Sequence, residues 1–181
     1  MPVPVFVWLL LTGVVLLGAG ATVGAAATDN SEEVRRYKKA AAKATAQTQA
    51  ARDKLKKAAT KFREYGRFEE FLVALVAVGF GVAYADGEIA ESEEQEIEEF
   101  LLGVTRSALP QRVKDQIERL RRHPPKFNES MEYMRQIENN PAFDRSVFDD
   151  IIQITMKADG KIHPGERAYL AAWKERMKKT E

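Results

Sequence analysis

The sequence contains no cysteine and only two histidines, His123 and His163. The absence of cysteine excludes disulfides, iron–sulfur clusters, thiolate zinc sites and cysteine nucleophiles, and it is compatible with a reducing compartment. Two histidines are too few for a zinc site built from several imidazoles. The 28 basic and 27 acidic residues nearly balance, so no overall field attracts nucleic acid and we expect no nucleic-acid partner.

The N-terminal segment PVPVFVWLLLTGVVLLGAGATVGAAA, residues 2–27, contains no charged side chain. About 20 helical residues cross a hydrocarbon layer of about 30 Å, so this segment is long enough to span a membrane. We therefore predict a transmembrane anchor over residues 1–28. The alternative is a secreted or periplasmic protein whose signal peptide is cleaved near residues 24–28. Against it, no Lys or Arg precedes the apolar run, which is longer than a signal core.

Positive charge follows the apolar segment and does not precede it. The positive-inside rule then predicts a single-pass protein of the inner or plasma membrane, with its N-terminus outside and its C-terminal domain in the cytoplasm. Gly20 and Gly24 have the GxxxG spacing that lets two membrane helices approach closely, so a homodimer is one expectation and lipid-exposed glycines are the other. The basic residues that set the orientation are Arg35, Arg36, Lys38, Lys39 and Lys43.

Residues 31–65 lack proline and glycine and are rich in Ala, Lys, Glu and Gln, which are strong helix formers. The segment predicts one long helix, or two in line, that begins at Ser31 and stops at Gly66. Its apolar positions are mostly alanine up to residue 54, so the large residues at heptad spacing that a coiled coil needs are missing. We interpret residues 29–65 as a solvated helical stalk.

The remaining residues, 66–181, are predicted to form a compact all-α domain of about six helices. Phe71–Ala85 is uncharged but short and contains two glycines, so it predicts a buried core helix and not a second membrane span. No segment alternates apolar and polar residues as a strand does. Five further apolar stripes at helical spacing begin at Ile97, Leu109, Phe127, Val147 and Tyr169.

One short pattern occurs twice, as ADGEIAESEE at 85–94 and ADGKIHPGER at 158–167. Each copy has Ala-Asp-Gly, one residue, Ile, and a Glu four positions after the Ile. We interpret each copy as a helix-loop-helix corner: an apolar helix enters, Asp-Gly turns the chain, Ile points back inward, and an amphipathic helix leaves.

The residues after each turn predict how the next helix begins. Pro164 suits a first helical position, which makes His163 the N-cap and places Glu166 at the third helical position, where its carboxylate can accept from free amides. The same register in the first copy places Ala90 at the cap and Glu93 at the third position.

The pattern D-G-x-I-x-x-x-E also equals the second half of a calcium-binding EF-hand loop. The two leading ligand positions of such a loop fall on Val82 and Tyr84 in the first copy, and on Thr155 and Lys157 in the second. None of these residues is a carboxylate, so we expect neither copy to bind calcium as an EF-hand does.

Two such corners, each preceded by an apolar helix, resemble the TerB-like family, which includes the tellurite-resistance TerB proteins and the N-terminal region of the membrane co-chaperone DjlA. The resemblance covers about residues 66–178 and implies an all-helical bundle in membrane-linked stress-response complexes. It also implies that the corner carboxylates bind a divalent metal. The alternative is that these carboxylates only stabilise the turn and cap the following helix, and that no ion binds. The implied ligands are Asp86, Glu93, Asp159 and Glu166.

His123-Pro124 is followed by Pro125 and not by the Asp of a J domain, so we expect no direct J-domain activity. The prediction is a non-enzymatic, membrane-anchored TerB-like module that recruits a protein partner or senses a divalent cation at the cytoplasmic face. No other cofactor is predicted. The alternatives are a structural element of a membrane assembly, whose corners only cap helices, and a metal-dependent hydrolase.

Overall fold

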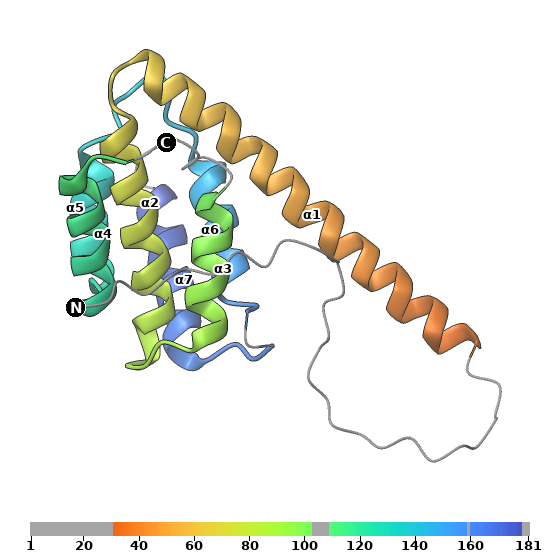
Figure 1. The fold of residues 1–181 in the computed structure, drawn as a ribbon. Helices are drawn as coiled ribbons and strands as arrows, with labels where there is room; N and C mark the ends of the chain where they lie inside the picture. Colours follow the sequence, from red (N-terminus) through yellow and green to blue (C-terminus); the bar gives the residue numbers. More distant parts are fainter. Residues whose placement is uncertain (1–30, 103–108, 159, 179–181) are drawn as a thin grey trace, which may run out of the picture.

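The computed structural model describes residues 31–102, 109–158 and 160–178, and the predicted anchor lies outside them. Within these residues the chain forms seven α-helices, one short 3-10 helix and no strand, so the all-α prediction is confirmed (Figure 1). The elements are α1 (Ser31–Glu64), α2 (Phe68–Ala83), η1 (Tyr84–Asp86), α3 (Glu91–Leu102), α4 (Gln111–Arg122), α5 (Phe127–Arg135), α6 (Arg145–Thr155) and α7 (Pro164–Lys178).

The helix α1 is continuous over 34 residues and ends where the sequence predicts. Gly66 has a φ of 67°, in the left-handed region, and its amide donates to the carbonyl of Arg63 at 3.0 Å. Glycine adopts this conformation at little cost, and it commonly terminates helices in this way.

The second half of α1 packs onto the rest of the bundle, whereas the described side chains between Lys39 and Ala50 are largely exposed. Leu55 and Phe62 are fully buried, and the ring of Phe62 stacks on that of Phe71 with centroids 4.4 Å apart. The interpretation of residues 29–65 as solvated therefore holds only for the described part before residue 51. Ala51, Ala58 and Ala59 are also buried, whereas Ala46 and Ala50 are exposed.

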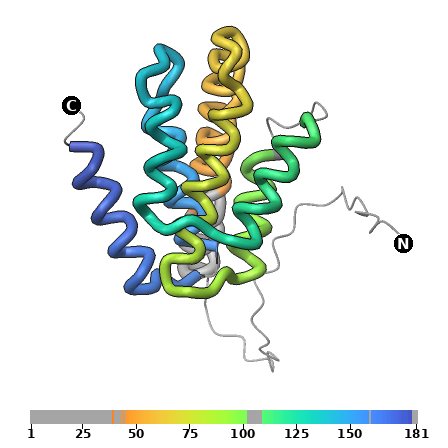
Figure 2. The backbone as a smooth tube through the Cα atoms, turned by 90° about the vertical axis from the view of Figure 1, so that its left-hand side faces the viewer, coloured from red at the N-terminus to blue at the C-terminus, as the bar shows by residue number. Residues whose placement is uncertain are grey.

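The helix α2 is the centre of the bundle, and Figure 2 shows other helices of the body beside it. It contacts every other described helix, and each residue from Phe71 to Ala83 is buried. Of the described helices, one segment, Phe68–Asp86, is long and apolar enough to cross a membrane, but 72% of its apolar window is buried inside the protein. It is the buried core helix that the sequence predicts.

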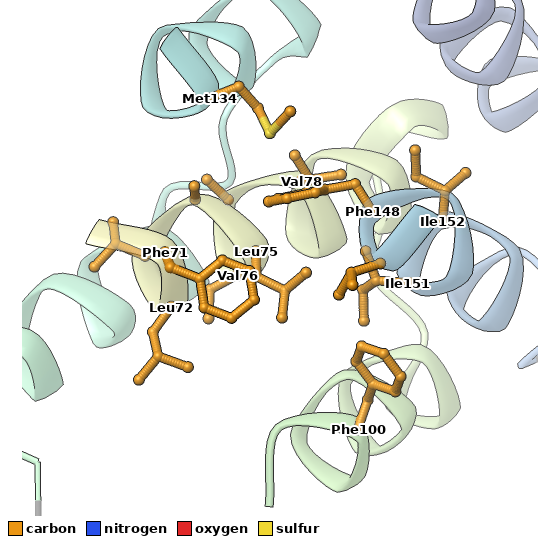
Figure 3. Packing of buried hydrophobic residues seen from close by; sticks show 14 of the residues in the cluster. Phe71, Leu72, Leu75, Val76, Val78, Phe100, Met134, Phe148, Ile151 and Ile152 are labelled. Carbon is orange, nitrogen blue, oxygen red and sulfur yellow. The ribbon is translucent and has the colours of Figure 1, made fainter. Parts of the chain in front are cut away.

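The core forms where α2 meets α6, α3 and α5 (Figure 3). Phe71 of α2 meets Phe148 of α6 edge to face, with centroids 6.1 Å apart, and Phe148 lies 6.2 Å from the ring of Trp173 in α7. Aromatic pairs at such distances add to the apolar area that each ring buries. The aromatic residues thus connect α2 to α6 and α7, which follow much later in the sequence.

Gly81 lies where the backbone of α2 approaches α5 and α7. A Cβ at this position would lie 2.4 Å from Ser130 Oγ and 3.1 Å from the Tyr169 hydroxyl. Ser130 is fully buried and donates to the carbonyl of Ala77 at 3.0 Å. Burial raises the pKa of the Tyr169 phenol, which therefore stays neutral. Glycine leaves room here for two buried hydroxyl groups.

We expect Gly81→Ala to lower the free energy of unfolding by about 1–3 kcal/mol, because overpacking outweighs the better helix propensity of alanine. Gly79→Ala is the matched control in the same helix, since its Cβ would meet only side-chain atoms of Ile97 and Ile151, at 3.3 to 3.4 Å. Denaturant unfolding of the two variants measures the difference. Equal stability would contradict this packing.

Candidate functional site

Both predicted corners form, and their turns have the same backbone geometry. Gly87 has a φ of 100° and Gly160 a φ of 76°. The amide of each glycine donates to the carbonyl three residues earlier, that of Tyr84 at 3.0 Å and that of Lys157 at 3.2 Å. Glycine is favoured at both positions because side chains disfavour a positive φ. The repeated Gly is thus explained by the backbone alone.

Asp86 stabilises the first turn with its side chain. Its Oδ1 accepts a hydrogen bond from the amide of Glu88 at 3.3 Å, which is the local bond that favours Asp in turns. The equivalent residue of the second corner, Asp159, lies outside the described residues.

The two corner glutamates occupy the cap positions that the sequence predicts. Glu93 Oε2 accepts from the amide of Ala90 at 2.8 Å, and Glu166 Oε2 accepts from the amide of His163 at 2.7 Å. Both side chains are buried, with exposed fractions of 6% and 1%. Each carboxylate therefore turns back onto the first turn of its own helix and satisfies a donor there, as in a capping box.

The two corners also pack directly against each other, which the sequence does not predict. The Oδ2 atom of Asp86 lies 3.4 Å from Nδ1 of His163. A Cβ at Gly165 would lie 2.2 Å from the carbonyl oxygen of Ala85 and 2.9 Å from the amide nitrogen of Asp86. The first turn of α7 therefore rests on the backbone of η1. The sequence does not predict this packing role of Gly165; its only signal is that Ser92 occupies the equivalent position in the first copy.

The prediction that both corner isoleucines point inward is wrong for the second copy. Ile89 packs against the core, whereas Ile162 is 44% exposed. The second corner contacts the first through His163 and Gly165, so Ile162 is left outside. Tyr84 is also exposed, at 39%. We call the surface formed by residues 84–90 and 160–163 the corner end of the bundle.

The described residues fit helix capping better than they fit a metal site. Across residues 31–102, 109–158 and 160–178, no group of three His, Asp or Glu side chains is placed to hold a metal. Glu93 and Glu166 are buried and bonded to amides, and Asp86 faces one imidazole. Metal binding by these residues with Asp159 stays a prediction, since Asp159 lies outside the described residues.

In a comparison with protein families, residues 72–177 match the family described as Tellurite resistance protein TerB. The matched region begins in α2 and ends in α7, so it includes both corners and the contact between them. No curated protein and no solved structure matches the chain.

We expect Gly165→Ala to lower the free energy of unfolding by about 1–3 kcal/mol, because the added methyl group overlaps the Ala85 carbonyl and pushes the corners apart. Ser92→Ala is the matched control at the equivalent position of the first corner, with an expected change within about 0.5 kcal/mol. Denaturant unfolding followed by far-UV circular dichroism compares the two. Identical midpoints would show that the corner contact does not stabilise the fold.

We expect Ca²⁺, Mg²⁺, Mn²⁺ and Zn²⁺ to produce no binding heat at micromolar concentrations when titrated into the purified full chain in detergent. The reason is that two of the four predicted ligands already serve as caps. Asp86→Asn is the comparison variant, because it removes a carboxylate that is not a cap. Micromolar binding that disappears in this variant would establish an ion site instead.

Proposed function

The chain belongs to the TerB family, and on this premise we propose that it is a membrane-anchored, non-enzymatic module that binds a protein partner at the cytoplasmic face. The corner end carries the proposal. At this end the helices α3 and α7 are capped and the two corners are packed together. Apolar side chains nevertheless remain exposed there. Because the family is described by tellurite resistance, we propose that this module acts in a stress response.

The chemistry of the corner end suits a protein partner. Three large apolar side chains are exposed in the described part of the chain, and two of them, Tyr84 and Ile162, belong to this end. The charged residues Glu88 and Lys161 are exposed on the same two turns. Apolar and aromatic side chains with charged neighbours are typical of protein interfaces. Because the turns are fixed by their caps and by Gly165, binding would require little ordering of the backbone.

The described residues offer little support for an enzyme. Burial, with help from neighbouring carboxylates, raises the pKa of Glu96 and of Glu98, as catalytic acids require. Neither glutamate lines the two cavities beside α1, which have volumes of about 460 and 500 Å³. The residues that line these cavities include no histidine, so they provide no imidazole acid or base.

The anchoring part of the proposal is supported by the uncharged segment 2–27 and by the basic residues that follow it. The continuous helix α1 would join this segment to the bundle, because its second half is part of the core. Replacement of Val14 and Leu17 by arginine would add about 5–7 kcal/mol to the insertion free energy of the segment. We therefore expect that double variant to leave the membrane fraction, while the unaltered chain resists carbonate extraction.

Site-specific photo-crosslinking in cells tests the partner-binding role. We expect a crosslinker at Tyr84 or Ile162 to trap one discrete protein. Tyr65, which is 53% exposed in the turn at the other end of α2, is the matched control and should trap none. Equal crosslinking from all three positions, or none from the corner end, would contradict the proposal.

A further inference from the structure

A stripe of lysines follows one face of α1. At 3.6 residues per turn, Lys39, Lys43, Lys54, Lys57 and Lys61 lie within about 60° of one another around the helix axis. We call these five residues the lysine stripe. The buried residues Leu55 and Phe62 point roughly 120° away from it, toward the bundle. The stripe therefore points to one side of the molecule, at an angle to the direction of the core.

Most of the lysines on the stripe are exposed and form no ion pair within the described part of the chain. Lys54 forms an ion pair with Asp150 of α6. The other four lysines are exposed, and among the described side chains none of them has an ion-pair partner. The positions between the two groups of lysines on this face, Ala46 and Ala50, are small and uncharged. The stripe extends over about 33 Å along the helix axis.

The end of the stripe nearest the bundle borders an open basin. This cavity has a volume of about 460 Å³ and lies between α1 and the segment that connects α5 to α6. Lys54, Lys57 and Lys61 line it together with Ala142 and Asp144. Asp144 uses its Oδ1 to accept from the amide of Ser146 at 2.9 Å, as the cap of α6. Lysine side chains thus provide most of the charge in the basin, which favours a phosphate group.

We propose that the lysine stripe binds the anionic phospholipid surface of the membrane, so that α1 lies along the bilayer. The inference rests on the proposed function, because the anchor would place α1 next to the lipid. A perpendicular helix of 34 residues would carry its far end about 50 Å from the surface. Charges act over only about 8 Å at physiological salt, so lysines near residue 61 would then gain nothing from the membrane. A parallel helix brings all of them within reach.

The absence of cysteine makes a direct test convenient, since one introduced cysteine carries the only thiol label. Ala50→Cys places a fluorescent probe on the stripe, and Thr45→Cys places it on the far side of the same exposed helical segment. The full chain is reconstituted in vesicles of phosphatidylcholine alone or mixed with phosphatidylglycerol. We expect the Ala50 probe to be shielded from acrylamide only in the anionic vesicles, and the Thr45 probe to stay accessible in both.

Charge removal shows whether the lysines cause this shielding. Each lysine near an anionic surface contributes about fivefold in binding, so Lys57→Gln with Lys61→Gln should shift the equilibrium toward the free helix by about 25-fold. The matched control, Lys114→Gln with Lys174→Gln, removes the same charge from exposed positions of α4 and α7 and should keep the shielding. Loss in both double variants would overturn the assignment to the stripe.

Two further outcomes would overturn the proposal. One is equal accessibility of the Ala50 probe in neutral and anionic vesicles. The other is shielding that depends on protein concentration and not on lipid charge, which would indicate a second copy of the chain on the stripe. Flotation with neutral vesicles tests the anchor separately. If the chain failed to float with neutral vesicles but anionic lipid still shielded the Ala50 probe, the proposed anchor would be contradicted. The proposal for the lysine stripe would still be supported.

Discussion

The contact between Gly165 and the backbone at Ala85 is the constraint on which the corner end depends. It brings the first turn of α7 onto η1, and η1 continues directly from the central helix α2. Any side chain at Gly165 would occupy the space of a carbonyl oxygen, so the two corners can pack this closely only with glycine at this position. The pair of Asp86 with His163 and the exposure of Ile162 accompany this contact. The two copies of the repeated motif thus pack together and form one end of the bundle.

Much of this arrangement is predictable from the sequence because it is local. The turn glycines, the cap positions of Glu93 and Glu166, and the stop at Gly66 each depend on a few neighbouring residues and on standard backbone geometry. The all-α class and the buried helix α2 follow from hydrophobic periodicity and from length. These features can be predicted without knowing which helices pack against each other.

The errors concern contacts between distant segments. The second half of α1 is predicted to be solvated, yet Leu55, Phe62 and three of its alanines are buried, and only the position of the neighbouring helices decides this. Ile162 and Ile89 have the same local pattern but different surroundings, because the second corner docks on the first and not the reverse. A carboxylate at the third position of a helix likewise suits both a cap and a metal ligand. The hydrogen bond that it accepts from the amide three residues earlier favours the capping role over the metal ligand.

Native-state hydrogen exchange at the amides of Ala90 and His163 tests most directly whether the corners form one unit held by caps and close packing. Both amides donate to buried glutamates, one in each corner. We predict that the two amides exchange with the same opening free energy, close to that of global unfolding, and that a metal chelator changes neither. Faster exchange after chelation would make the corners ion sites, and independent opening of the two amides would contradict the interlocked arrangement.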